Sequence, residues 1–252
     1  MLNILLCGIG GKMGGNIADL LKDDGDARIV CGVDIHAPEG CKVPVYTHFS
    51  QVKEKVDVII DFSSPAALAG ELEYAAKNNV PAVLASTGYA AEQLESIKEA
   101  SKSVAVFKTA NFSLGVNLLV ALAKKAAAVL GEDFDIEIVE RHHNQKVDAP
   151  SGTALMLADG MNEVLAEKRP YVEGRSGIVG KRGNEIGIHA VRGGTIVGEH
   201  EVMFAGEDEI VTLSHSARSK KVFAAGAIKA AKWIAGKPAG LYDMTDVLGD
   251  IL

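Results

Sequence analysis

The sequence predicts an α/β fold with an N-terminal, doubly wound parallel sheet and a C-terminal α+β domain whose sheet is mixed or antiparallel. Residues 1–113 alternate short apolar strands with helical stretches, which is typical of a doubly wound sheet. A glycine-rich turn follows the first strand. From about residue 114 a long Ala/Leu/Val helix is followed by strands of alternating polarity, which indicates a sheet with one buried face.

The glycine-rich turn indicates nucleotide binding. A buried strand over residues 4–7 leads into Gly8-Ile9-Gly10-Gly11-Lys12-Met13-Gly14-Gly15 and then into a helix. In Rossmann-type domains such glycines let the backbone approach a pyrophosphate, which binds at the helix N-terminus. The match to G-x-G-x-x-G is imperfect because Met13 occupies the third glycine position, and Gly8, Gly11 and Gly14 form G-x-x-G-x-x-G instead. Taken alone, the turn is a weak signal.

A second strand over residues 27–33 strengthens the interpretation because it ends at Asp34, 26 residues after Gly8. An acid near this position binds the adenosine ribose hydroxyls; the alternative is that Asp34 only opens a solvated loop. A carboxylate repels the 2′-phosphate of NADPH, so Asp34 favours NADH. Lys12 and His36 supply positive charge, which leaves the use of both cofactors open.

Three further strands, over residues 56–61, 81–85 and 104–107, complete the predicted parallel sheet. Ligands of such sheets bind at the carboxyl ends of the strands. We therefore expect the segments that follow these strands to line the cofactor site: Phe62-Ser63-Ser64, Ala85-Ser86-Thr87 and Thr109-Ala110-Asn111-Phe112. A helix over 222–235 is expected to return to this sheet, which gives a dinucleotide-binding domain of residues 1–113 with 222–252.

The second domain, residues 114–221, is predicted to bind the substrate and to mediate oligomerisation. A helix over 115–130 precedes strands predicted at 134–140, 185–191, 195–204 and 209–215. The turn Arg192-Gly193-Gly194 suggests a largely antiparallel arrangement. Residues 168–184 are rich in glycine and charge and are expected to form a mobile loop.

Residues 140–154 contain the densest group of chemically active side chains. His142 and His143 are followed by Lys146, and Ser151 is placed to cap a helix whose first amides belong to Gly152 and Thr153. A positive helix end binds carboxylates, and the imidazoles and ammonium can bind an anion and give a proton. The alternative is a pair of ordinary surface histidines. No metal is expected, because the two histidines are adjacent and no third ligand is near.

Composition excludes several classes of protein. The net charge of −7 and a pI near 5.5 argue against nucleic-acid binding. No apolar run reaches the roughly 18 residues of a membrane span. Cys7, Cys31 and Cys41 form neither a disulfide framework nor a zinc spacing. With no recognisable leader, the chain is expected to be cytoplasmic.

Over its whole length the chain resembles the dihydrodipicolinate reductase (4-hydroxy-tetrahydrodipicolinate reductase) family of diaminopimelate and lysine biosynthesis. The central His-His…Lys-Val-Asp-Ala-Pro-Ser-Gly-Thr motif is highly specific, whereas the glycine turn is not. The resemblance rests on Gly8–Gly14, Asp61-Phe62-Ser63, Ser86-Thr87-Gly88, Asn111–Asn117, His142-His143 with Lys146–Ala154, Arg192-Gly193-Gly194 with Gly198-Glu199-His200, and Phe223–Ala227 with Trp233.

The resemblance implies hydride transfer from NADH or NADPH to 4-hydroxy-tetrahydrodipicolinate, giving tetrahydrodipicolinate. It implies that His142 is the general acid/base, that Lys146 is the proton donor, and that His143 binds the substrate carboxylates together with the amides of Gly152 and Thr153. It also implies a homotetramer built through the C-terminal sheet. The cofactor-binding residues that it implies are Gly8, Ile9, Gly10, Gly11, Lys12, Met13, Asp34, Ala85, Ser86, Thr87, Thr109, Ala110, Asn111 and Phe112.

One departure from the family pattern concerns charge. Family members commonly carry Arg-His where this chain has Asn144-Gln145. We expect Arg141, at a position where a small residue is common, to restore part of the missing positive charge beside the substrate.

Three other functions are distinguishable from this one. A semialdehyde dehydrogenase needs a nucleophilic cysteine in its catalytic domain, but every cysteine precedes residue 42. An aspartate dehydrogenase lacks the run of residues 142–153. A nicotinamide-sensing protein without catalysis would make no use of His142 or Lys146.

Overall fold

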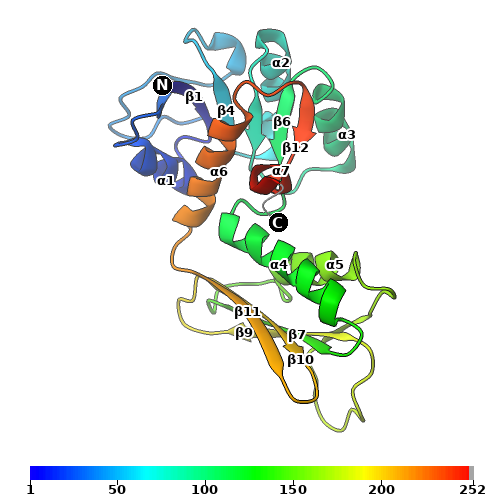
Figure 1. Cartoon of the computed structure of the whole chain (residues 1–252). Helices are drawn as coiled ribbons and strands as arrows, with labels where there is room; N and C mark the ends of the chain where they lie inside the picture. The colour runs from blue at the N-terminus through cyan, green and yellow to red at the C-terminus, as the bar shows by residue number, and fades with distance from the viewer. Residues whose placement is uncertain (250–252) are drawn as a thin grey trace. The chain divides into compact units, whose positions relative to one another are not determined.

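The computed structural model describes residues 1–249, which form two compact units. The first comprises Met1–Ser113 with Lys221–Gly249, and the second comprises Leu114–Lys220 (Figure 1). Residues 250–252, which we assigned from the sequence to the dinucleotide-binding domain, lie outside the described part. Within residues 1–249 no helix has the length and apolarity needed to cross a bilayer.

The first unit contains a parallel sheet of seven strands in the order β12-β6-β5-β4-β1-β2-β3. The order reverses at β1, since β2 lies on one side of it and β4 on the other, and ligands of doubly wound sheets bind at such a point. The sheet confirms the predicted fold class, and the short strands β3 and β12 are additions to it. The strands are β1 (Leu2–Cys7), β2 (Ala27–Val33), β3 (Val45–Tyr46), β4 (Val58–Asp61), β5 (Ala82–Leu84), β6 (Ala105–Lys108) and β12 (Gly240–Tyr242).

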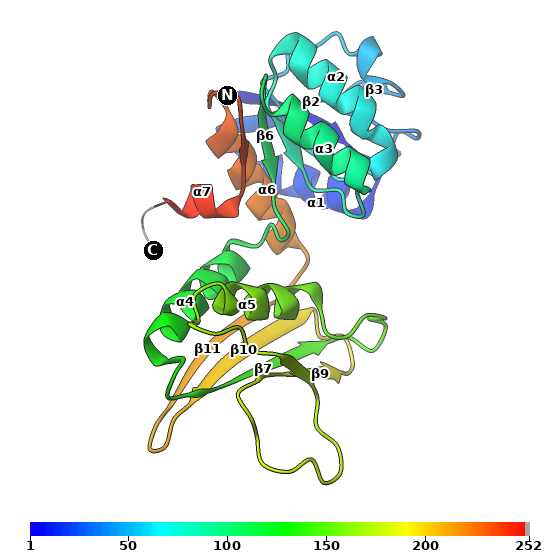
Figure 2. The same cartoon turned by 90° about the vertical axis from the view of Figure 1, so that its right-hand side faces the viewer.

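Helices cover both faces of this sheet (Figure 2). Helices α1 (Lys12–Leu21) and α6 (Lys221–Ile234) pack on one face, and α2 (Leu68–Asn78) and α3 (Ala91–Ala100) on the other. Because both faces are buried, successive residues of β1 are apolar and inaccessible rather than alternating. Three short helices complete the unit: η1 (Phe49–Gln51), η2 (Pro65–Ala67) and α7 (Met244–Leu248).

The second unit contains a mixed sheet in the order β11-β10-β7-β9-β8. Helices α4 (Leu114–Leu130) and α5 (Gly152–Asn162) lie side by side on one face of it (Figure 2). Strands β10 and β9 flank β7, which β10 meets antiparallel and β9 parallel. The turn at Arg192–Gly194 therefore joins strands that are not neighbours, and the largely antiparallel arrangement suggested by this turn was wrong. The strands are β7 (Asp135–His142), β8 (Tyr171–Glu173), β9 (Ile186–Arg192), β10 (Gly198–Ala205) and β11 (Ile210–Ala217).

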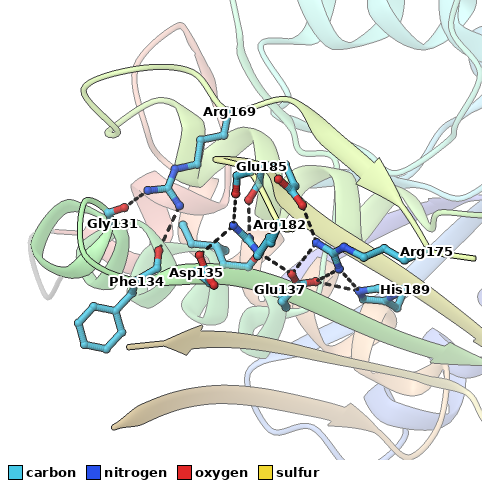
Figure 3. Close-up of polar contacts among 11 residues, drawn as sticks. Gly131, Phe134, Asp135, Glu137, Arg169, Arg175, Arg182, Glu185 and His189 are labelled. Atoms are coloured by element: carbon cyan, nitrogen blue, oxygen red, sulfur yellow. Dashed lines mark hydrogen bonds and ion pairs between the residues drawn. The ribbon is translucent and has the colours of Figure 1, made fainter. Parts of the chain in front are cut away.

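Two arginines bind the segment 168–184 to the sheet, and the mobility expected from its composition stays a prediction. It contains strand β8, and Figure 3 shows Arg175 and Arg182 converging on Glu137 of β7. Arg175 donates to both carboxylate oxygens of Glu137 at 3.0 and 2.8 Å, and Arg182 Nε donates at 3.0 Å. Burial alone would raise the pKa of Glu137, but hydrogen bonds from Arg175, His189 and Arg182 outweigh it and lower that pKa to about 2.

Candidate active site

The glycine turn of the first unit is built by close backbone contacts. Gly8 has φ +81°, and a Cβ there would lie 2.6 Å from the carbonyl oxygen of Phe62. A Cβ on Gly14 would lie 2.4 Å from the carbonyl oxygen of Gly8. Gly14 therefore permits the close helix–strand packing that the third glycine of G-x-G-x-x-G provides, which explains why Met13 is tolerated.

Asp34 is joined to this turn. Its Oδ2 accepts a hydrogen bond from the Gly10 amide at 2.9 Å, and its Oδ1 accepts one from the His36 amide at 3.3 Å. A carboxylate has further lone pairs, so Asp34 can still accept from ribose hydroxyls. Ile35 is exposed beside it.

A cavity of about 1020 Å³ opens at the carboxyl ends of β1, β2 and β4. Of the residues expected to hold the cofactor, Gly8, Gly10, Gly11 and Asp34 line it; Phe62, Ser63 and Ser64 also line it, as expected. The other expected cofactor residues do not line this cavity: Ile9, Lys12, Met13, Ala85, Ser86, Thr87, Thr109, Ala110, Asn111 and Phe112.

Several residues that line the cavity could not be predicted from the sequence. His48, Tyr74 and Lys77 belong to no motif and reach the cavity because η1 and α2 pack beside β2 and β4. The residues present fit a dinucleotide, since a cradle that only glycine can form lies next to a strand-end acid. Within the described chain, moreover, no side chain caps α1, so its N-terminus suits a pyrophosphate.

A pair of buried acids lies close to this cavity. Asp61 ends β4 and accepts hydrogen bonds from Ser63 and from the hydroxyl of Tyr89. Glu71 of α2 is 0 % exposed, and neither of its carboxylate oxygens has a partner among residues 1–249. Burial, together with the charge of Asp61, raises the pKa of Glu71 well above its ordinary value and so favours the uncharged form of this acid.

In the second unit, β7 presents Glu140 and His142 on the face that packs against α5, because alternate residues of a strand share a face. The sequence predicted that this strand ends at residue 140, before His142. In the structure His142 is the last residue of β7. The Glu140 side chain is 0 % exposed, and its Oε2 lies 2.6 Å from His142 Nδ1. Arg192 of β9 donates to both oxygens of Glu140, at 2.7 and 2.8 Å.

The loop from His143 to Ser151 is held at several points. The Asn144 amide donates to Gly194, and Arg192 donates to the carbonyl of Asp148. At the end of the loop the Ser151 amide donates to Glu140 Oε1 at 3.0 Å. These bonds hold the backbone of the loop relative to the end of β7.

Ser151 caps α5, as predicted. Its hydroxyl oxygen accepts from the Ala154 amide at 3.2 Å and lies 3.0 Å from His200 Nε2. The first-turn amides of α5, those of Gly152 and Thr153, point along the helix axis away from its body. A positive helix end is thus presented beside the loop, where a carboxylate is stabilised.

Lys146 and His143 lie in this loop. Lys146 Nζ is 2.8 Å from both carboxylate oxygens of Asp148, and this hydrogen bond lowers the pKa of Asp148. His143 Nδ1 is buried and has no partner among the described residues. The structure therefore brings His142, His143, Lys146, Gly152 and Thr153 together around one loop. Glu140, Arg192 and His200 also belong to this group of contacts, but the sequence motif did not identify them.

His200 is the buried histidine behind Ser151. Burial, with a smaller contribution from the charge of His142, lowers the pKa of His200 to about 4, so this ring is neutral at neutral pH. The sequence placed His200 in a strand without a role.

Arg141 is turned away from His142, contrary to the expectation that it adds positive charge beside the substrate. It lies on the opposite face of β7 from Glu140 and His142, and Nη1 is 3.9 Å from Glu199 and 3.8 Å from Glu201. The strand alternation that brings Glu140 and His142 together turns Arg141 away from them.

A glycine cradle with a strand-end acid, combined in one chain with a histidine–lysine loop before a capped helix, defines an oxidoreductase that uses a pyridine nucleotide. Models of the N-terminus and the C-terminus of dihydrodipicolinate reductase match residues 2–112 and 115–248. The chain belongs to the dihydrodipicolinate reductase family.

Similar proteins agree with this membership. The chain is 52% identical to 4-hydroxy-tetrahydrodipicolinate reductase of Caldanaerobacter subterraneus subsp. tengcongensis, with 98% of each chain covered. It is 48% identical to the enzyme of the same name from Clostridium novyi, again with 98% of each covered. A solved structure of dipicolinate-bound dihydrodipicolinate reductase from Paenisporosarcina sp. TG-14 has a TM-score of 0.83 at 26% identity, covering 96% of this chain and 97% of that one.

Proposed function

We propose that this enzyme reduces 4-hydroxy-tetrahydrodipicolinate to tetrahydrodipicolinate with a nicotinamide cofactor, in diaminopimelate and lysine biosynthesis. The observation that carries the proposal is the loop of residues 142–151, which places two imidazoles and one ammonium before the N-terminus of α5. The bacterial relatives carry this reductase name, and the solved relative binds dipicolinate, a flat dicarboxylate.

Three side chains of the loop and two amides of α5 have parts in this reaction. Lys146 gives the proton that the reduced ring requires, and His142 is the general acid/base. His143 and the amides of Gly152 and Thr153 bind the two carboxylates of the substrate. Proton transfer by a positioned side chain contributes about 10²–10⁴ in rate.

The cofactor, when bound, supplies the hydride. Asp34 accepts from its adenosine ribose, and NADH is favoured because a carboxylate at this position repels a 2′-phosphate; the exposed Lys12 and His36 keep NADPH usable. The pyrophosphate and nicotinamide are held by Gly8, Ile9, Gly10, Gly11, Lys12, Met13, Ala85, Ser86, Thr87, Thr109, Ala110, Asn111 and Phe112.

We extend the proposal to assembly and location. A homotetramer built through the sheet of the second unit is supported by β11, an edge strand of eight residues that carries the exposed Ile210. A cytoplasmic location is supported by the free cysteines Cys7, Cys31 and Cys41. The division into a dinucleotide-binding and a substrate-binding domain follows the two compact units.

The test is oxidation of NADH, and separately of NADPH, followed at 340 nm while dihydrodipicolinate synthase makes the substrate from pyruvate and aspartate semialdehyde. Lys146→Ala should lose about 10²-fold or more in kcat while keeping NADH affinity. Lys124→Ala is the matched control, since it removes a lysine that forms an ion pair with Glu163 elsewhere in the same unit. A folded wild-type protein that binds NADH but oxidises neither cofactor would contradict the proposal and favour a sensor.

A further inference from the structure

We propose that Glu140 is the positioning residue of the active site: its buried carboxylate holds the proton of His142 on Nδ1 and fixes Ser151 at the start of α5. The general acid/base, His142, and the anion-binding N-terminus of α5 are then both held by the same residue, Glu140. The inference rests on the proposed function for the role of His142, and it adds the residue that determines which ring nitrogen exchanges protons.

The first step is the charge of Glu140. Burial alone would raise its pKa, but the hydrogen bonds from Arg192, His142 and the Ser151 amide outweigh burial and hold the pKa of Glu140 below its ordinary value. Glu140 is therefore a carboxylate at neutral pH. An ionised carboxylate only accepts hydrogen bonds, so at 2.6 Å the partner nitrogen, His142 Nδ1, must donate. In the neutral ring Nε2 is then the nitrogen that carries the free lone pair.

The second step is the rigidity of the carboxylate. Arg192 binds both of its oxygens in a two-pronged arrangement, and the Ser151 amide adds a third bond. A guanidinium fork fixes the plane of a carboxylate as well as its position. Arg192 also donates to the Asp148 carbonyl, so the same side chain anchors the loop that carries Lys146.

The third step is the absence of a competing partner for Nδ1. Arg192 on β9 binds Glu140 rather than the ring, and His200 on β10 faces the ring. His200 is neutral, and its ring lies edge-on to His142 with centroids 5.2 Å apart. Among residues 1–249, Glu140 is thus the one acceptor recorded at Nδ1.

Gly198 of β10 leaves space for the other nitrogen of the ring. A Cβ on Gly198 would lie only 3.1 Å from His142 Nε2. The lack of a side chain at Gly198 therefore lets the ring take the position in which Nδ1 contacts Glu140.

The chain contains its own control for this arrangement. Glu137, on the opposite face of the same strand, accepts from Arg175 and Arg182 and lies 2.8 Å from His189 Nε2 (Figure 3). Its replacement removes a comparable glutamate–arginine–histidine cluster without touching His142. Glu137→Gln therefore controls for the loss of a networked carboxylate from β7.

The first measurement is the ¹⁵N spectrum of the histidine-labelled, full-length protein without substrate, with His142 assigned by the loss of its signals in His142→Gln. In the neutral ring of His142 we expect the wild type to carry the proton on Nδ1 and none on Nε2. Glu140→Gln should shift the population toward the Nε2–H tautomer, and Glu137→Gln should leave it unchanged. A neutral wild-type His142 ring with its proton on Nε2 would overturn the inference without reference to any variant or to the reaction.

The second measurement is kinetic. Glu140→Gln should lower kcat about 10²–10⁴-fold, as loss of the orienting carboxylate does in other carboxylate–histidine pairs, with less than about a tenfold change in NADH affinity. Glu137→Gln should keep kcat within about threefold. A folded Glu140→Gln that retains both wild-type kcat and the wild-type tautomer would overturn the inference. Because the spectrum requires no turnover, failure of the reductase assignment would leave the tautomer result intact, and the two outcomes are distinguishable.

Discussion

Lys146 Nζ lies 2.8 Å from each of the two carboxylate oxygens of Asp148, two residues along the same loop. The proposed proton donor is thus held by a partner that is itself fixed, because Arg192 binds the carbonyl of Asp148. The ion pair places the ammonium but also offsets the positive charge that would attract a dianion.

Replacing Asp148 should separate these two effects. Asp148→Asn leaves the shape of the loop and removes one negative charge, so we expect the affinity for dipicolinate to rise several-fold, on the scale of about 1 kcal/mol for a partly exposed charge. We expect kcat to fall by about tenfold because Nζ loses its two-point anchor. Calorimetric titration with dipicolinate and steady-state kinetics measure the two quantities.

A second variant shows whether the effect is local. Asp159→Asn removes an acid of α5 that accepts from the Tyr171 hydroxyl and does not touch Lys146. It should leave both quantities near their wild-type values. Equal changes in the two variants would indicate net charge rather than the Lys146 contact as the cause.

Cofactor preference should depend on Asp34. Asp34→Ser removes the carboxylate that accepts from Gly10 and that we assign to the ribose hydroxyls. Loss of a hydrogen bond to a charged group costs about 1.5–3 kcal/mol, so KM for NADH should rise by about 10–100-fold. KM for NADPH should fall, because the repulsion of the 2′-phosphate is removed.

The ratio of kcat/KM for the two cofactors is the readout. Asp19→Ser is the control, since Asp19 of α1 pairs with Lys221 on the surface. An unchanged ratio in Asp34→Ser would show that cofactor choice is made elsewhere.

How much of this site could be read from the sequence depended on how local each contact is. Gly8, Gly14 and Asp34 act within one βαβ unit, and Ser151 caps a helix that begins at the next residue, so spacing alone was informative. The partnership of Glu140 with Arg192 joins residues 52 positions apart. It exists because β9 pairs parallel with β7, an arrangement that strand patterns do not specify.

The contacts of the segment 168–184 could not be predicted for the same physical reason. Arg175 and Arg182 bind a carboxylate on a strand that is 38 and 45 residues away in the sequence. Arg141 shows the converse: its proximity to His142 in sequence suggested a shared site, and the alternation of β7 separates them.

Glu71 should make the first unit less stable as pH rises. Its pKa is raised in the folded chain, so folding keeps a proton that the unfolded chain releases above the ordinary value of 4.5. Stability is therefore unaffected below that pH and declines toward pH 8. Glu71→Gln removes the titration. The melting temperature of the variant minus that of the wild type should therefore increase by several degrees from pH 5 to pH 8, at about 2–4 °C per kcal/mol.

Thermal melts at pH 5 and pH 8 measure the difference. Glu95→Gln removes an exposed acid from α3 and should track the wild type at both values. Parallel curves for Glu71→Gln and the wild type would show that Glu71 is ionised in the folded protein.

His200 should make the second unit sensitive to acid. Its pKa is lowered from 6.5 to about 4 by burial first and then by the charge of His142, against the opposing effect of Glu140. Between these values the unfolded chain binds a proton that the folded chain does not, so stability falls as pH decreases from 6.5 toward 4. A shift of this size corresponds to at most about 3 kcal/mol, and His200 is 4 % exposed, so little of it is lost to solvent screening.

His200→Gln tests this argument because it removes the titration while retaining a polar group that can reach Ser151. The variant should be less stable than the wild type at pH 7, where the contact at 3.0 Å is weakened. The difference in stability should narrow as pH falls to 4, because only the wild type loses the stability linked to the lowered pKa of His200. The lowered pKa values of Glu137 and Glu140 affect both proteins equally and leave the difference unchanged. Urea unfolding at intervals between pH 4 and 7 measures the gap, with His36→Gln, an exposed histidine, as the control that should follow the wild type. A constant gap would mean that His200 binds its proton in the folded state as readily as in the unfolded one.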